Sequence, residues 1–254
     1  MFDTHAHYDS NAFNDDRHDL LASLPNQGVS LIVNPGCDVE TSQKAVSYAA
    51  QYPHVYAAVG IHPSDCGDCT IADLDTIAAL AKADKVVAIG EIGLDFYWKD
   101  NAPRDVQEDF FCRQIELAHS LDLPIIVHDR EAHGATMDVL GRYNDVSGVL
   151  HCFSGSPEMA KWLLDHGYYL GFDGPITYKN AIKAKEVIAI TPLERIVIET
   201  DSPYLTPVPF RGKRNDSSKL VYVAETIAQW KRISTEEVIA ITRDNGKRLF
   251  KMEG

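Results

Sequence analysis

Short runs of apolar, often β-branched residues alternate with amphipathic stretches along the chain, and this alternation is the feature that most restricts its fold. Eight such runs follow one another at a spacing of roughly thirty residues, the length of one strand–helix unit. No stretch rich in Pro, Gly or Ser separates them. The pattern predicts one domain, residues 1–254, folded as a (β/α)8 TIM barrel of the α/β class. The expected strands are residues 2–7, 29–34, 55–61, 85–91, 124–128, 147–152, 168–172 and 195–200.

Several of the helical stretches between these strands carry end signals. Ser156 precedes Pro157, which is the typical order of an N-cap and a first helical residue. Ser234 is expected to begin a capping box that opens a last helix, ending at about residue 248. Gly28 and Gly167 stand just past helices, where a left-handed residue is expected. The other expected helices are residues 17–26, 40–51, 71–83, 103–121, 133–143, 157–166, 179–190 and 218–231.

A doubly wound open sheet is the alternative fold for such an alternation. That fold would place a glycine-rich phosphate-binding turn directly after the first strand. This chain has His5-Ala6-His7 at that point instead. We therefore favour the barrel.

The bulk composition fits a globular protein without a membrane segment. The length of 254 residues is close to that of a single barrel of this type. No basic region with a following apolar stretch opens the sequence, and no apolar run could cross a bilayer, so we expect a cytoplasmic monomer with no membrane partner. The odd count of 5 cysteines predicts no disulfide framework. Cys66 and Cys69 form a CxxC pair that could be redox-active or half of a zinc site, but no second pair accompanies it, so we favour reduced loop cysteines.

The net charge of -13 argues against a broad electrostatic attraction to nucleic acid. It does not exclude a polyanionic substrate. Two bound divalent cations would add about four positive charges at the place where such a substrate reacts.

Six side chains of metal-ligand type close apolar runs of this kind. Because active sites of TIM barrels lie at the carboxyl ends of the strands, these side chains are expected to meet at one mouth. Singly, each has an ordinary explanation, such as a hydrogen-bonded histidine or an acid paired with a basic side chain. Together they supply four imidazoles and two carboxylates, which suits a two-metal hydrolytic site. The six are His5, His7, Glu91, His128, His151 and Asp201.

Neighbouring residues extend this hypothesis. The period of two along a strand places Asp3 and Glu199 one layer below the ligands, where they are expected to orient ligand histidines. His62 ends the third strand and is expected to contact substrate, with a hydrogen bond at the rim as the alternative.

Two surface features suggest contacts to a nucleic acid. Three cations follow the eighth strand and are expected to bind a phosphate backbone, although a solvated loop is the alternative. Tyr97 and Trp98 could stack a base or simply pack their own loop. The three cations are Arg211, Lys213 and Arg214.

These motifs resemble the TatD-type metal-dependent deoxyribonucleases, a branch of the amidohydrolase-like barrels. The resemblance runs from residue 2 to 250 and rests on eight ordered stretches. They are Asp3-Thr4-His5-Ala6-His7, Gly60-Ile61-His62-Pro63, Gly90-Glu91-Ile92-Gly93-Leu94-Asp95, Pro124-Ile125-Ile126-Val127-His128, His151-Cys152-Phe153-Ser154-Gly155, Glu199-Thr200-Asp201-Ser202-Pro203-Tyr204-Leu205, Phe210-Arg211-Gly212-Lys213-Arg214-Asn215 and Asn245-Gly246-Lys247-Arg248-Leu249-Phe250.

The resemblance implies two divalent ions, Mg²⁺, Mn²⁺ or Zn²⁺, that share Glu91. His5, His7, Glu91 and Asp201 would hold the first ion, and Glu91, His128 and His151 the second. It further implies hydrolysis of DNA phosphodiester bonds, from single strands or strand ends, with Asp201 as the general base and a role in DNA repair. After Arg214-Asn215 the chain departs from the family pattern of an acid and a proline, since it has Asp216-Ser217-Ser218. This departure leaves the shape of that loop open.

Two other kinds of function use the same residues. One is a deacylase on aminoacyl-tRNA or an amidohydrolase on a small molecule, because one fold hosts many reactions. The other is a metal-binding scaffold without catalysis. A scaffold would lack a ligand or the base, and this chain lacks neither.

Overall fold

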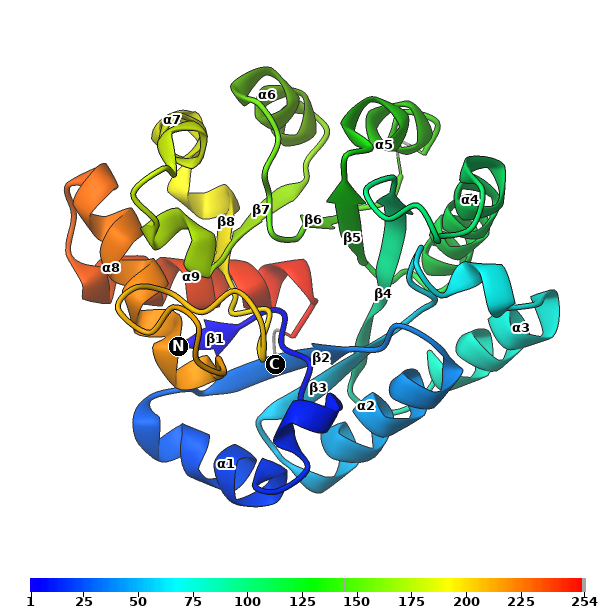
Figure 1. The fold of residues 1–254 in the computed structure, drawn as a ribbon, viewed down its shortest axis with the longest axis horizontal. Coiled ribbons are helices and arrows are strands. Elements are labelled where there is room, and N and C mark those ends of the chain that lie inside the picture. Colours follow the sequence, from blue (N-terminus) through cyan, green and yellow to red (C-terminus); the bar gives the residue numbers. More distant parts are fainter. Residues whose placement is uncertain (144, 253–254) are drawn as a thin grey trace.

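The computed structural model describes residues 1–143 and 145–252, in which eight parallel strands follow the order β1 to β8. Helices alternate with the strands and surround them (Figure 1). The prediction of a (β/α)8 barrel is therefore confirmed. The strands are β1 (Phe2–Asp3), β2 (Leu31–Pro35), β3 (Val55–Val59), β4 (Val86–Asp95), β5 (Ile125–Arg130), β6 (Gly148–Leu150), β7 (Tyr169–Phe172) and β8 (Ile196–Ile198).

The helices lie where the sequence predicts them, with ends that differ by a few residues. Ser156 accepts a hydrogen bond from the backbone N of Met159 and so caps its helix as expected. Ser234 accepts from the backbone N of Glu237 at 3.1 Å, which is one half of the predicted capping box. Gly28 and Gly167 both have a φ of 84°. The helices are α1 (Arg17–Ser23), α2 (Val39–Gln51), α3 (Ile71–Leu80), α4 (Arg104–Ser120), α5 (His133–Leu140), α6 (Pro157–Asp165), α7 (Ile182–Ile190), α8 (Leu220–Lys231) and α9 (Thr235–Leu249).

The barrel is closed by the segments that follow β1 and β8. The backbone N of Thr4 donates to the Ile198 carbonyl at 3.2 Å, and the N of Asp201 donates to the His5 carbonyl at 2.9 Å. An isolated parallel bridge joins Ala6 and Ser202. The first and last strands thus bring two segments of candidate ligands side by side.

The interior of the barrel is filled by one apolar cluster to which every strand contributes. Phe250, just after α9, packs on Phe2 with ring centroids 5.9 Å apart, so the end of α9 adds to this cluster. In Figure 1, α9 (red) runs close to β1. The strand residues of the interior cluster are Phe2, Val33, Ala58, Val87, Ala88, Ile126, Val149, Tyr169 and Val197.

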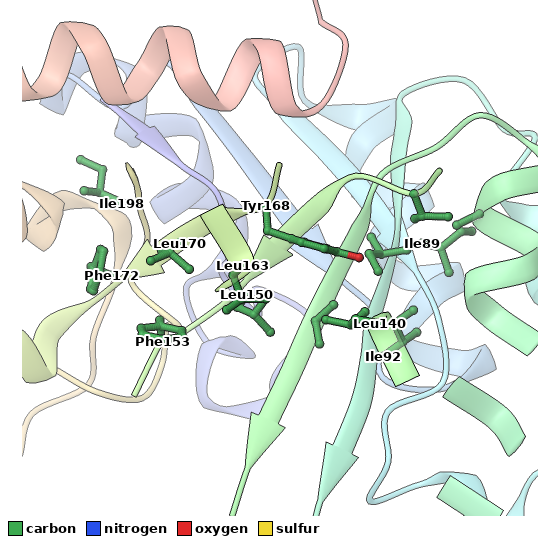
Figure 2. Close-up of a cluster of buried hydrophobic side chains, with 14 of the residues drawn as sticks. Ile89, Ile92, Leu140, Leu150, Phe153, Leu163, Tyr168, Leu170, Phe172 and Ile198 are labelled. Atoms are coloured by element: carbon green, nitrogen blue, oxygen red, sulfur yellow. The ribbon is translucent and has the colours of Figure 1, made fainter. Parts of the chain in front are cut away.

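A larger apolar core lies between the strands and the outer helices. Side chains of Ile89, Leu150 and Leu170 point from their strands toward this core, beside Leu140 of α5 and Leu163 of α6 (Figure 2). Outside β4, where Val87 and Ala88 both join the interior cluster, successive strand residues face the interior and this outer core in turn, as the period of two requires. On the interior side, the strand residues nearest the carboxyl ends lie at the mouth of the barrel.

The strand ends differ from the predicted ends near all six candidate ligands, as β1 and β4 illustrate. β1 stops at Asp3, before His5 and His7, and β4 continues beyond Glu91 to Asp95. The pairing register of β4 with β5 shifts between Ile89 and Ile92. Glu91 therefore lies inside an irregular strand and does not close it, contrary to the sequence-based expectation.

Two smaller observations concern the cysteine pair and the absence of a predicted membrane segment. Cys66 and Cys69 are free and lie at a 3-10 turn before α3, with Cys66 buried. Within residues 1–143 and 145–252, no helix combines the length and the apolar character needed to span a membrane.

Candidate metal centre

Glu91 lies at the centre of the predicted ligand cluster, and its two carboxylate oxygens face different histidines. The side chain is buried at the barrel mouth, with a residue exposure of 3%. The structure brings all six predicted ligands together around it.

The Oε2 atom of Glu91 faces the first two histidines. It lies 3.2 Å from Nε2 of His5 and 3.5 Å from Nε2 of His7. Oδ1 of Asp201 lies 3.7 Å and 3.5 Å from the same two nitrogen atoms. One oxygen of Glu91, one of Asp201 and two imidazole nitrogens therefore surround one small volume.

The Oε1 atom of Glu91 faces the other two histidines. It lies 2.8 Å from Nδ1 of His128 and 2.8 Å from Nε2 of His151. Nε2 of His62 is 3.6 Å from the same oxygen. This second group matches the set expected for a second ion, with His62 next to it.

The charges of the cluster are strongly coupled. Burial would raise the pKa of Glu91, but the nearby His151 and His5 outweigh it and hold the pKa well below its usual value. Burial likewise works against an ionised Asp201, yet the hydrogen bond with His7 lowers its pKa. Both acids are therefore carboxylates at neutral pH.

The histidines respond to these carboxylates in different ways. Burial opposes protonation of His151, but Glu91 and Glu199 raise its pKa well above the usual value. The pKa of His7 is raised in the same way by Cys37 and Asp201, against the effect of burial. Burial dominates at His62 and lowers its pKa to about 3. His62 is therefore a neutral imidazole.

The donor atoms suit divalent metal ions. Groups of three that could hold an ion, with ligand atoms within 4.8 Å of one another, include His5, His7 and Asp201, and His62, Glu91 and His128. Imidazole nitrogens and carboxylate oxygens are common ligands of Zn²⁺ and Mn²⁺. The Nε2 atoms of His5 and His7 lie 3.0 Å apart, so both could donate a lone pair to one ion once the two imidazoles are neutral there.

Two acids support the histidines from behind. Asp95 accepts from Nε2 of His128 at 3.1 Å, so His128 is held between two carboxylates. Oε1 of Glu199 lies 3.6 Å from Nδ1 of His151 and also accepts from the backbone N of Cys152. Glu199 thus lies beneath a ligand histidine, as predicted.

The same expectation is wrong for Asp3. Its carboxylate accepts hydrogen bonds from the side chains of Thr200 and Ser217, both at 2.6 Å, and it contacts His5 only through the backbone N at 3.4 Å. The reason is that β1 ends at Asp3, so the period of two does not continue to His5. Asp3 instead ties β1 to the segment after β8.

A cavity of about 1160 Å³ opens above the cluster. His62, Trp98 and Tyr204 line this cavity. Trp98 is 54% exposed and Tyr204 is 57% exposed. Lys44 and Arg130 bring positive charge to its wall. The guanidinium of Arg130 lies 5.4 Å from the ring centroid of Trp98.

The three predicted phosphate-binding cations are not among the residues that line this cavity. Arg214 pairs with Asp16 at 2.6 Å and lies over the ring of Phe13. Arg211 stacks on Tyr178 at 4.5 Å from the ring centroid. Lys213 is exposed.

Three residues near the centre were missed by the sequence analysis. Cys37 follows β2 and groups with His7 and Glu91 within 4.8 Å. Asp95 shares the alternation of Glu91 along β4, so the period of two could have indicated it. Asp173 follows β7, the same position that marked the other ligands on their strands.

An eight-stranded barrel with imidazoles and carboxylates gathered at the carboxyl ends of its strands defines a metal-dependent hydrolase. The family model described as TatD related DNase matches residues 2–251. The chain belongs to this family of metal-dependent, ester-bond hydrolases.

Individual relatives agree with this assignment. The chain is 44% identical to the uncharacterized metal-dependent hydrolase YabD of Bacillus subtilis, over 99% of both chains. It is 35% identical to the 3'-5' ssDNA/RNA exonuclease TatD of Salmonella typhimurium, again over 99% of both. The crystal structure of YjjV, a TatD homolog from Escherichia coli, superposes with a TM-score of 0.92 at 32% identity, covering 99% of this chain and 98% of that one.

Proposed function

We propose that this protein is a divalent-metal-dependent phosphodiester hydrolase that removes nucleotides from the ends of single-stranded DNA. The observation that carries the proposal is Glu91, whose two oxygens each face a separate pair of histidines. Such a shared acid would suit a pair of divalent ions, which is the arrangement common in phosphodiester hydrolysis. The name of the Salmonella relative supports action from the 3' end, on DNA or RNA.

The proposed roles of the residues follow from their positions. His5, His7, Glu91 and Asp201 would hold one ion, and Glu91, His128 and His151 the other. Bound divalent ions lower the pKa of water and stabilise charge on phosphoryl oxygens. Asp201, an ionised carboxylate beside His7, would accept the proton of the attacking water.

The cavity wall supports a nucleic-acid strand as the substrate. Trp98 and Tyr204 expose aromatic rings on which unpaired bases can stack, and Arg130 and Lys44 can meet phosphates. Such contacts do not depend on base identity, so we expect little sequence preference. His62 would contact the substrate as a neutral imidazole, and Arg211, Lys213 and Arg214 would contact the strand outside the cavity.

The large cavity with exposed aromatic walls favours this substrate over a small molecule, whose site would be smaller and more enclosed. Deacylation of aminoacyl-tRNA uses the same metal chemistry and is an outcome that the assay below can reveal. A cytoplasmic location, a monomeric state and a role in DNA repair stay predictions.

The test is cleavage of an end-labelled single-stranded oligonucleotide with Mg²⁺, Mn²⁺ or Zn²⁺. We expect stepwise shortening that stops with chelator and on circular strands, and a fall of about 10³-fold in kcat for Asp201→Asn. The exposed Asp138→Asn on α5 is the matched control and should behave as the wild type. Unchanged cleavage by the Asp201 variant would rule out the site. When an aminoacyl-tRNA is supplied in parallel, release of its amino acid without strand cleavage would favour the deacylase.

A further inference from the structure

A second, smaller cavity lies beside the metal centre. Its volume is about 250 Å³, and it is formed by the segment after β6, the 3-10 turn Gly174–Thr177 after β7, and the start of α7. Cys152, Ser154 and Pro175 line both this side cavity and the large one. A ligand that lies in the large cavity can therefore extend into the side cavity.

The walls of the side cavity are mostly apolar. Phe153 and Ile176 are nearly buried, with exposures of 8% and 3%, and the ring of Tyr178 forms another wall. Gly155 is required here, because a Cβ at this position would lie 2.7 Å from the ring of Phe153. Aromatic and aliphatic walls of this kind suit a flat, partly apolar ring.

One acid interrupts these apolar walls. Asp173 lines the cavity with an exposure of 2%, and its Oδ2 atom has no hydrogen-bond partner among the described residues. A buried polar group without a partner is costly, so such groups normally have a protein, water or ligand partner. Asp173 is not among the residues that would hold the metal ions.

The size and charge of the side cavity restrict its ligand. A volume of 250 Å³ is slightly below that of pockets for drug-sized molecules, so it takes one ring system and no second one. The buried carboxyl of Asp173 brings no positive charge to the inner wall, so a phosphate is better held at the metal centre. A ring that carries hydrogen-bond donors and acceptors satisfies both conditions, and a nucleobase is such a ring.

We propose that the side cavity binds the terminal nucleobase of the strand whose scissile phosphate lies at the metal centre. This inference rests on the proposed function and deepens it, because a cavity for a single base explains action at a strand end. The walls Phe153 and Tyr178 hold the ring, and Asp173 pairs with its polar edge. Lys183 is exposed, with its Nζ 3.5 Å from the Ser154 carbonyl, and would meet a backbone phosphate of the strand.

Binding is tested first with the four deoxynucleosides, which carry no phosphate, on the metal-loaded protein by saturation-transfer NMR. Ala184→Trp fills the side cavity from α7, and Ala189→Trp places the same side chain at an exposed position of that helix. We expect binding by the wild type and by Ala189→Trp, and none by a folded Ala184→Trp. Asp173→Asn, which keeps the shape, should change the order of affinity among the four nucleosides.

Kinetics then connect the side cavity to the reaction. Removing the terminal base from the oligonucleotide should raise KM for the wild type by roughly tenfold with kcat nearly unchanged, as expected for the loss of one stacked base. Ala184→Trp should raise KM for the intact strand similarly and leave the abasic strand unaffected. Equal KM values for the two strands in the wild type, nucleoside binding by Ala184→Trp, or an unaltered order of affinity in Asp173→Asn would overturn the inference. Failure to cleave any oligonucleotide would instead overturn the proposed function.

Discussion

At the scale of single residues, the carboxylates and imidazoles of the metal centre interact with one another before any ion binds. His7 and His151 have pKa values raised well above the usual range, so both tend to be imidazolium ions at neutral pH. A metal ion requires neutral imidazoles and must displace these protons. Metal affinity is therefore coupled to pH through these two side chains.

This coupling predicts opposite pH trends with and without metal. In the metal-free protein, the contribution of His7 and His151 is fully present below the unfolded pKa of about 6.5 and is lost as pH rises through the raised folded values. Glu91, whose pKa is depressed, stays ionised over this range. Tm in chelator should thus fall from pH 6.5 to pH 8.5, whereas excess metal should raise Tm more at the higher pH.

Differential scanning fluorimetry measures both trends. His7→Gln removes one of the histidines with a raised pKa and should flatten the metal-free slope. A metal-free Tm that rises between pH 6.5 and pH 8.5 would contradict the raised pKa values of His7 and His151.

Some residues of the metal centre could be predicted from their neighbours in the sequence, and others could not. His5, His7, Glu91, His128, His151 and Asp201 could be predicted because each is a ligand-type side chain beside an apolar run. Asp3 was placed wrongly, because the end of β1 depends on how the barrel closes and not on its own sequence. Cys37 could not be predicted, because a single thiol after a strand carries no pattern until the fold surrounds it.

At the scale of elements, β4 shows where the periodicity argument loses force. The strand is buried along its whole length, and its register with β5 shifts just where Glu91 lies. A continuous apolar run predicts a buried strand but gives no information on such a shift. Helix ends were easier to predict, since Ser156, Pro157 and Gly167 act on their own helix alone.

Gly93 permits the close approach of β4 to β5. Its φ is 141°, and a Cβ on it would lie 2.0 Å from the carbonyl oxygen of His128. Gly93→Ala should therefore lower the free energy of unfolding by roughly 3 kcal/mol or more, from strain and steric overlap. It should also weaken metal binding, because His128 must move.

Gly134 is the matched control on α5. Nothing lies within 4 Å of a Cβ there, so Gly134→Ala should stabilise the protein by about 0.5–1 kcal/mol. Urea denaturation of both variants gives the comparison. Equal stability of the two would contradict the proposed role of Gly93.

At the scale of the whole molecule, the barrel has one functional end and one structural end. The ligands gather at the carboxyl ends of the strands, whereas Phe2 and Phe250 pack at the start of β1. The sequence could predict this barrel, because eight repeats of strand and helix leave few alternatives. It could not predict the role of α9 in the interior cluster. The apolar pattern of a helix shows which side is buried but not which part of the protein covers that side.

Phe250→Ala should separate stability from activity. The variant opens a cavity beside Phe2 and should cost about 3–5 kcal/mol of unfolding free energy. Metal stoichiometry and kcat below the lowered Tm should stay unchanged, because the substitution is remote from the mouth. Thermal unfolding and elemental analysis measure these quantities, with the exposed Val208→Ala as a neutral control.

The closure of the barrel also fixes when the catalytic centre can exist during synthesis. Asp3 is bonded to Thr200 and Ser217, which lie 197 and 214 residues later in the chain. A ribosome therefore releases His5 and His7 long before Asp201 and the segment that holds β1 in place. Any nascent chain that stops before this segment lacks a complete ion-binding mouth, so loading with metal must follow the synthesis of nearly the whole barrel.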